Sequence, residues 1–200
     1  MRYLSLVLPV MATLMLPISV SDATTITYVA SLSGPGESPP NASPGTGFAT
    51  VTTNDVANTL SVDVTFSGLQ GTTTASHIHC CVLPPGGTGV ATTIPTFAGF
   101  PLGATSGTYS NILDLTLASS YNPAFITANG GTVASAETAL LAGLVAGQAY
   151  LNIHTSAFPG GEIRGFLAPV PIPAVGLPGG ILLLAGAGLL NWWRHRQRFA

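Results

Sequence analysis

The middle of the chain alternates hydrophobic and polar residues with a period of two. Leu60, Val62, Val64 and Phe66 alternate with serine, aspartate and threonine. Successive side chains of a strand point to opposite faces, so this pattern predicts a strand with one buried face. The same pattern or a β-rich composition predicts further strands over residues 26–32, 47–53, 75–82, 113–117, 148–155 and 162–167.

Turn-forming residues separate these segments and leave room for one helix. Asn-Asp, Pro-Pro-Gly-Gly and Pro-Gly-Gly runs mark turns between predicted strands. Ser135 can cap a short helix in which Leu140, Leu141 and Leu144 fall on one face. About seven strands with one short crossover helix predict an all-β fold of the β-sandwich type for residues 24–168.

The N-terminal segment has the features of an export signal. Arg2 precedes an uncharged apolar run from Leu4 to Leu16, which is short for a membrane span. Small residues follow at 21–23, where a signal peptidase cleaves. We expect residues 1–23 to be a signal peptide; the alternative is an N-terminal membrane anchor.

The C-terminal segment, residues 169–200, predicts a membrane helix with a defined orientation. A proline-rich stretch precedes about twenty mostly apolar residues from Ala174 to Trp193, a length that just spans a bilayer as a helix. Trp192 and Trp193 suit the membrane interface, and three arginines follow them. Because arginine-rich ends stay in the cytoplasm, the body of the protein is expected outside.

This order of motif, apolar helix and basic end resembles the PEP-CTERM family of sorting signals, in the variant with the motif Val-Pro-Leu-Pro-Ala. In this sequence isoleucine replaces the leucine of the motif. The resemblance implies that an exosortase removes the tail and passes the protein to the surface of a Gram-negative bacterium that makes extracellular polysaccharide. A permanent single-pass anchor is the alternative. The motif consists of Val170, Pro171, Ile172, Pro173 and Ala174.

The charge distribution excludes nucleic acid as a partner. The chain has no lysine, and four of its five arginines lie at the two ends. Residues 24–168 contain six carboxylates and only one base, Arg164. A region of this charge repels phosphate backbones.

The middle region contains the stretches Ser-His-Ile-His-Cys-Cys at 76–81 and Tyr-Leu-Asn-Ile-His-Thr at 150–155. These two stretches resemble the CHRD domain, first described in chordin and common in bacterial secreted proteins. The most characteristic feature is the motif Gly161-Glu162-Ile163-Arg164-Gly165, whose usual following glutamine is Phe166 here. The resemblance implies an immunoglobulin-like β-barrel with limited similarity to copper/zinc superoxide dismutases, and it implies no assigned activity.

Three histidines are candidate metal ligands. On a strand, His77, His79 and Cys81 share one face, and His154 lies opposite its apolar neighbours Leu151 and Ile153 on another. The histidines converge only if the two strands are neighbours. Imidazoles at this spacing suit copper or zinc, with Cys81 as a possible soft ligand. The alternative is that they are hydrogen-bonding surface residues.

The two cysteines are adjacent in sequence. Export permits a disulfide, but neighbours on a regular strand project to opposite faces. We therefore expect a buried thiol at Cys80 and an exposed thiol at Cys81.

Arg164 is expected to pair with a carboxylate and fix the strand register. The candidate partners are Glu162, which shares its face of the last strand, and Asp63 or Asp114 on other strands. A structural role is favoured over ligand recognition, since a second basic group for an anion site is missing from the middle region.

Three functions follow from these features. The leading interpretation is a non-enzymatic surface or matrix module that is cleaved by signal peptidase during export, trimmed by an exosortase and displayed with polysaccharide or surface proteins. The alternative is a copper- or zinc-binding protein that uses His77, His79 and His154. A dismutase-like enzyme is least favoured, because an acidic domain with one arginine offers little attraction for an anionic substrate. Sequence motifs of hydrolases and nucleotide-binding loops do not occur.

Overall fold

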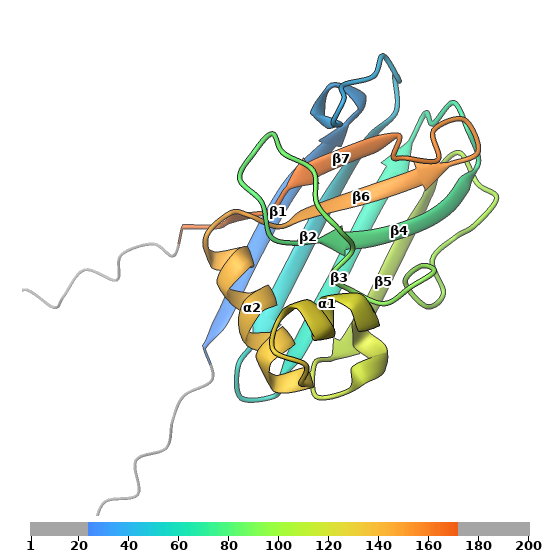
Figure 1. Cartoon of the computed structure of the whole chain (residues 1–200). Coiled ribbons are helices and arrows are strands. Elements are labelled where there is room, and N and C mark those ends of the chain that lie inside the picture. Colours follow the sequence, from blue (N-terminus) through green and yellow to red (C-terminus); the bar gives the residue numbers. More distant parts are fainter. Residues whose placement is uncertain (1–23, 172–200) are drawn as a thin grey trace, which may run out of the picture. The chain divides into compact units, whose positions relative to one another are not determined.

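Eight strands form one curled antiparallel sheet in a computed structural model that describes residues 24–171 (Figure 1). The strand order is β4-β6-β7-β1-β2-β3-β5, and the short β8 pairs with β1. The prediction of a mostly β fold is confirmed, with one continuous sheet. The strands are β1 (Thr25–Ser33), β2 (Thr46–Asn54), β3 (Thr59–Ser67), β4 (Thr73–His79), β5 (Gly107–Asp114), β6 (Tyr150–Thr155), β7 (Ile163–Phe166) and β8 (Ala168–Pro169).

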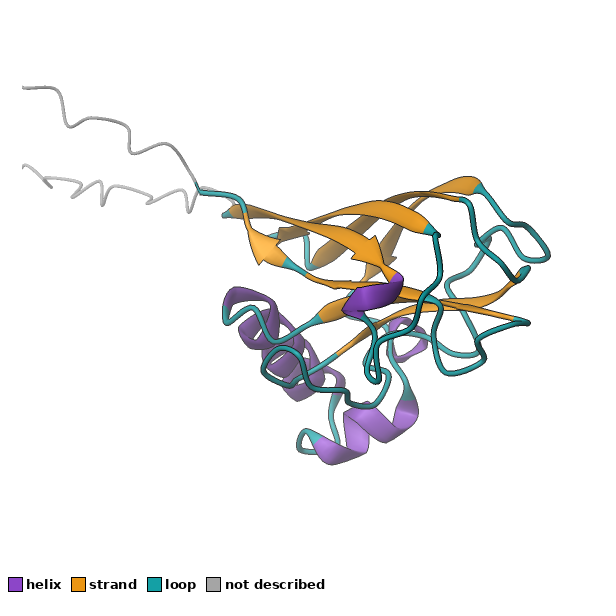
Figure 2. Cartoon of the chain, turned by 90° about the horizontal axis from the view of Figure 1, so that it is seen from above, coloured by secondary structure: helices purple, strands orange, loops and turns teal. Residues whose placement is uncertain are grey.

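The hydrophobic core lies inside the curl of the sheet. The alternating residues of β3 behave as predicted: Val62 and Val64 are buried and Asp63 is exposed. Ile78 of β4 and Leu151 of β6 belong to the same core. Figure 2 shows the strands in two layers, as expected of a sheet that folds back on itself. The curl thus gives a sandwich-like arrangement from a single sheet.

Two α-helices, not one, lie side by side at one end of the sheet (Figures 1 and 2). They are α1 (Pro123–Ala128) and α2 (Val133–Val145), and short 3₁₀ turns occur at Gly34–Gly36 and Ala118–Ser120. The residue that caps α2 is Thr132, whereas the predicted Ser135 is the reciprocal partner in a capping box. Leu140 and Leu144 are fully buried, so the predicted apolar face of α2 packs on the core.

Two predicted strands end earlier than expected. β4 stops at His79, so Cys80 and Cys81 lie outside it. β5 stops at Asp114, and a turn follows in which Leu115 is buried and Leu117 is exposed. Asp114 accepts hydrogen bonds from the backbone and hydroxyl of Thr116, and this local turn replaces the continued strand.

The sequence predictions for the two ends fall mostly outside the described residues. The signal peptide, residues 1–23, the helix from Ala174 to Trp193 and the residues Ile172, Pro173 and Ala174 of the sorting motif all lie outside them. Val170 and Pro171 of the motif are described and are exposed. Within residues 24–171, no helix combines the length and the apolar character needed to cross a membrane.

Candidate metal centre

The three histidines come together because β4 and β6 are antiparallel neighbours. His77 pairs with Asn152 and His79 pairs with Tyr150, whereas Ile78 pairs with Leu151 on the core face. His154, two residues after Asn152, lies on the same face as the other two histidines. The condition for their convergence is therefore met.

Loops cover this face and fix the orientation of each imidazole ring. Nε2 of His77 donates to the carbonyl of Pro95 at 2.6 Å, and Nδ1 of His79 donates to that of Thr88 at 2.8 Å. Nδ1 of His154 donates to the carbonyl of Pro159 at 2.9 Å. Because a carbonyl only accepts, each bonded nitrogen carries the proton and the other nitrogen of a neutral ring has a free lone pair.

The other three nitrogens lack hydrogen-bond partners within residues 24–171. They are Nδ1 of His77, Nε2 of His79 and Nε2 of His154, and all three are buried. One ring nitrogen from each histidine lies within 4.8 Å of the others, and the ring centroids are 5.3 to 5.9 Å apart. Ligands at about 2.0–2.1 Å from a tetrahedral zinc lie about 3.4 Å apart, so the three nitrogens must approach one another to bind one ion together.

Burial keeps the rings in the neutral form that binds metals. His77 and His79 are 6% and 7% exposed, and His154 is half-buried. Burial lowers the pKa of His79 to about 4, and it also lowers the pKa values of His77 and His154. Lone pairs rather than protons therefore face the centre of the cluster near neutral pH.

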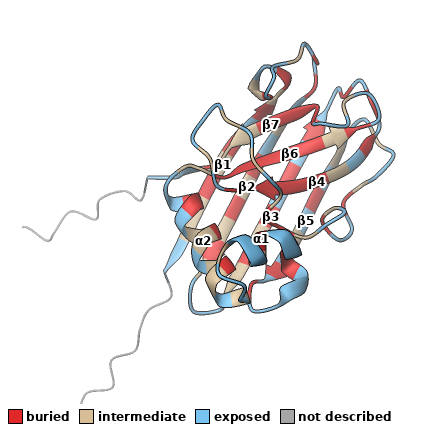
Figure 3. Ribbon diagram, in the orientation of Figure 1, coloured by how far each residue is buried: buried red, intermediate tan, exposed pale blue. Residues whose placement is uncertain are grey.

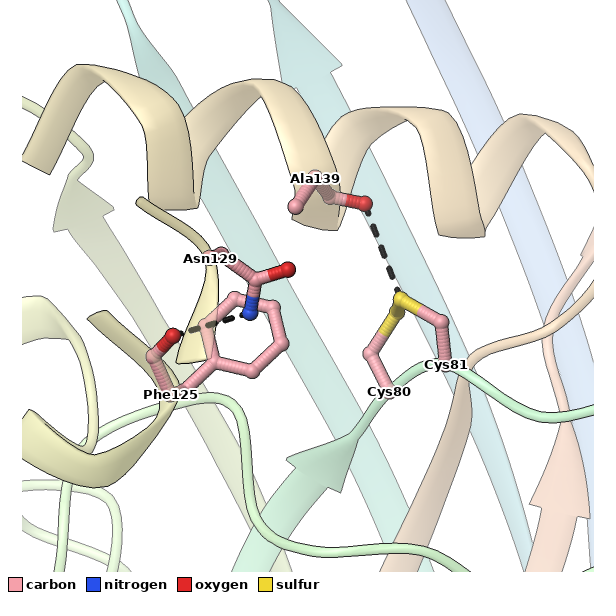
Figure 4. The surroundings of a disulfide bond; sticks show 5 residues. All are labelled: Cys80, Cys81, Phe125, Asn129 and Ala139. Carbon is pink, nitrogen blue, oxygen red and sulfur yellow. Dashed lines mark hydrogen bonds between the residues drawn. A yellow bond between two sulfur atoms is a disulfide. The ribbon is translucent and has the colours of Figure 1, made fainter. Parts of the chain in front are cut away.

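The expectation for the cysteines is wrong. Cys80 and Cys81 form a disulfide across a cis peptide bond immediately after β4 (Figure 4). It packs beneath α2, where a Cβ on Gly143 would overlap both sulfur atoms. With its sulfur in a disulfide, Cys81 does not offer the thiolate that a metal requires.

Arg164 has a different partner from those predicted. Its Nε donates to the carbonyl of Gly36 at 2.6 Å and lies 3.7 Å from a carboxylate oxygen of Glu37. Its Nη2 donates to the carbonyl of Pro85 at 2.7 Å, and its guanidinium lies 4.6 Å from the ring centre of Tyr150. Arg164 thus joins two loops to β6 and β7.

The remaining residues of the Gly-Glu-Ile-Arg-Gly motif hold loops around the same face. Glu162 is fully buried, and its carboxylate accepts from the hydroxyls of Ser43 and Thr155 and from the backbone of residues 70 and 71. Burial raises the pKa of Glu162, but the combined effect of these four hydrogen bonds is larger. The pKa of Glu162 is therefore below its usual range. Ile163 packs in the core. A Cβ on Gly165 would overlap the carbonyl of Ser31.

Tyr150, Asn152 and Thr88 also shape the site, although sequence reasoning did not assign them a role. Figure 3 shows that β6, which carries two of them, is buried along most of its length. Asn152 is 2% exposed. A polar residue at the centre of a buried strand is unusual, and this feature of the sequence could have identified Asn152 as a site residue. Thr88 lies in a loop, where no periodicity marks it.

Glu37 is the fourth such residue. It is 5% exposed, and burial raises the pKa of its carboxyl to about 7 against the attraction of Arg164, which lowers it. One carboxylate oxygen, Oε1, lacks a partner within the described residues. The sequence feature that could have identified Glu37 is its position as the single carboxylate in a loop rich in proline, glycine and serine at residues 34–47.

Comparison with known proteins gives one match. The profile of the CHRD domain family matches residues 28–167, which include all three histidines and the Gly-Glu-Ile-Arg-Gly motif. The curated proteins and the solved structures that were compared with the chain gave no match. Since the match covers more than half of the chain and every strand except part of the first and the short last one, the chain belongs to the CHRD domain family.

Proposed function

We propose that this protein is an exported β-domain that binds one copper or zinc ion through His77, His79 and His154. One observation carries the proposal: three neighbouring histidines each have a buried ring nitrogen without a partner within the described residues, and one ring nitrogen of each lies within 4.8 Å of the others. Leaving buried polar atoms unpaired costs about 1–3 kcal/mol each, and a metal ion provides one partner for all three.

The chemistry of the donors favours these two metals. Neutral imidazoles suit copper and zinc, whereas calcium and magnesium require oxygen ligands. Each ring also donates its other N–H to a backbone carbonyl, the arrangement that commonly orients a metal-binding histidine. Three protein ligands leave one coordination position for water or another small ligand.

Metal binding is proposed here without turnover. An anionic substrate such as superoxide needs an attractive field to reach a metal. Residues 24–168 carry six carboxylates and one arginine, and that arginine is already engaged by Glu37. The acidic charge of residues 24–168 therefore favours a binding module that holds an ion over a dismutase, which must attract an anionic substrate.

Export and sorting form the second part of the proposal. CHRD domains are typical of secreted proteins, and this chain is a member of that family. The charged and apolar pattern of residues 1–23 supports a cleaved signal peptide, and that of residues 169–200 supports an exosortase-type sorting signal. Comparing the mass of the protein from cells and medium with the encoded 20.2 kDa tests both cleavages. An intact full-length chain in the cytoplasm contradicts this part.

The metal proposal is tested by equilibrium dialysis of the untagged full chain against Zn²⁺ and Cu²⁺. We expect one ion per chain, and a loss of at least tenfold in affinity for His77→Ala, His79→Ala and His154→Ala. His195→Ala is the matched control, because His195 lies in the basic C-terminal end and should not alter binding. Circular dichroism checks that each variant is folded.

Two results contradict the metal proposal. One is a wild-type chain that holds no stoichiometric ion. The other is a set of folded variants that bind as tightly as the wild type. Either result leaves the non-enzymatic surface module without a metal as the function that the family membership and the terminal segments support.

A further inference from the structure

A polar cavity adjoins the histidine cluster and shares His79 with it. It has a volume of about 360 Å³ and is lined by residues that include Glu37, Gly87, Tyr150, Asn152 and Arg164. Small-molecule sites typically measure about 300–1,000 Å³, so the cavity has room for more than bound water. Its walls come from the loop after β1, the loop after β4 and the neighbouring strands β6 and β7.

Three side chains in this cavity have hydrogen-bonding atoms that are not paired. Arg164 is 2% exposed, and its Nη1 has no hydrogen bond within residues 24–171, although Nε and Nη2 are bonded. Oδ1 of Asn152 and Oε1 of Glu37 are buried without a partner within the same residues, and the Asn152 amide lies beside the Glu37 carboxylate. Buried polar atoms are normally paired, so these two oxygens point to a ligand that the protein does not itself supply.

The charges and acceptors define the class of that ligand. The Arg164 cation lies 3.7 Å from the Glu37 carboxylate, so the two charges compensate each other. A charged ligand would therefore find no free opposite charge in the cavity. Oε1 of Glu37 and Oδ1 of Asn152 lack partners and require donors. A hydroxyl group both donates and accepts, whereas a carboxylate or carbonyl only accepts.

The ring and the hydroxyl of Tyr150 are already engaged by neighbouring groups of the protein. The ring of Tyr150 has His79 stacked on it at 4.8 Å and the guanidinium of Arg164 at 4.6 Å. Its hydroxyl donates to the carbonyl of Thr88 and accepts from the Thr88 backbone N–H. The ligand is therefore recognised by hydrogen bonds.

We infer that this cavity binds a neutral, hydroxyl-rich small molecule, a polyol or a monosaccharide unit, through Arg164, Asn152 and Glu37. A ligand oxygen accepts from Nη1 of the guanidinium, and the hydroxyl protons of the ligand go to the unpartnered Oε1 of Glu37 and Oδ1 of Asn152. The inference goes beyond the proposed metal binding and does not depend on it, because His79 only contributes to one wall of the cavity.

Gly87 allows the cavity to be filled without altering any hydrogen-bonding group. A Cβ on Gly87 would lie 3.7 Å from Nη1 of Arg164 and 4.0 Å from the hydroxyl of Tyr150, both ordinary contact distances. A leucine there would extend into the cavity. Gly89 is the matched control, since a Cβ there meets nothing within 4 Å and Gly89 does not line this cavity.

The test is a calorimetric titration of the full chain, in a detergent without a sugar headgroup, with glucose, galactose, mannose and inositol. Glucuronate and glucosamine serve as charged counterparts. We expect saturable binding of at least one neutral compound and weaker binding of both charged ones. Gly87→Leu should weaken binding at least tenfold, and Gly89→Leu should leave it unchanged. If Gly87→Leu does not fold, Asn152→Leu, which keeps the size of the side chain, takes its place.

The outcomes separate this site from the metal site. His77→Ala, which does not line the cavity, should retain sugar binding even if it changes metal binding. The inference is overturned if no neutral compound binds saturably, if the charged compounds bind more tightly, or if the folded cavity variants bind as the wild type does.

Discussion

The ring of Tyr150 lies parallel to the ring of His79, with 4.8 Å between their centroids and 9° between their planes. The two side chains also share one acceptor. The carbonyl of Thr88 accepts from Nδ1 of His79 at 2.8 Å and from the hydroxyl of Tyr150 at 3.1 Å. Tyr150 thus fixes the plane of the imidazole and the position of the carbonyl that orients it.

Tyr150→Phe should weaken zinc binding about tenfold while the fold is retained. Phenylalanine keeps the stacked ring but removes both hydrogen bonds to Thr88, and loss of a residue that orients a metal ligand typically costs 10–100-fold in affinity. Zinc affinity is measured by competition with a chromophoric chelator. Tyr109→Phe, which loses one hydroxyl bond to Ala98, is the control. Equal affinities for the two variants would refute the positioning role.

At a pH well above 7, where Glu37 is ionised, Arg164→Ala should lower the free energy of unfolding by about 3–5 kcal/mol, because it leaves the buried Glu37 carboxylate without its cation. It also removes the hydrogen bonds to Gly36 and Pro85. Urea denaturation measures the change. Adding Glu37→Gln to this variant should recover part of the loss, since it removes the unpaired charge. A loss below about 1 kcal/mol for Arg164→Ala would show that the ion pair is not structural.

Glu162→Gln should destabilise the fold by about 3 kcal/mol at neutral pH. An amide group would face donors from Ser43, Thr155 and the backbone of residues 70 and 71, and it cannot accept from all of them. The hydrogen bonds lower the folded-state pKa below the usual 4.5. The stabilisation is therefore present above pH 4.5 and is lost as the pH falls through the folded-state value. A deficit in the variant that does not shrink in acid would contradict this account.

Glu37 should give the opposite pH dependence. Its folded-state pKa is raised from 4.5 to about 7, so between these values the native protein holds a proton that the unfolded chain has released. The wild type should lose stability from this group as the pH rises from 4.5 to 7. Glu37→Gln removes this dependence, and its stability relative to the wild type should therefore increase with pH across the window. A constant difference would show that burial does not raise the pKa of Glu37, and a falling difference would show that the carboxylate is stabilised in its charged form.

Strand periodicity predicted the framework of the site. Alternation identified the inward Val62 and Val64, and it placed His77 and His79 on a face opposite Ile78. The period-two pattern does not determine which strands are neighbours in the sheet. The neighbours β4 and β6 are far apart in sequence, so the convergence of His154 with the other histidines could be stated only as a condition.

The errors occur where the chain leaves regular structure. Strand periodicity up to residue 82 places the two cysteines on opposite faces, but β4 ends at His79. The partner of Arg164 was sought on strands, whereas Glu37 lies in the loop after β1. A loop has no repeating geometry from which a contact across the fold can be derived.

The most direct test of the central claim is X-ray absorption spectroscopy of the zinc-loaded full chain carrying His195→Ala, which retains only the three cluster histidines. We predict three imidazole nitrogens at about 2.0–2.1 Å from the zinc and no sulfur ligand. Fewer than three imidazoles, or a sulfur at about 2.3 Å, would contradict the account.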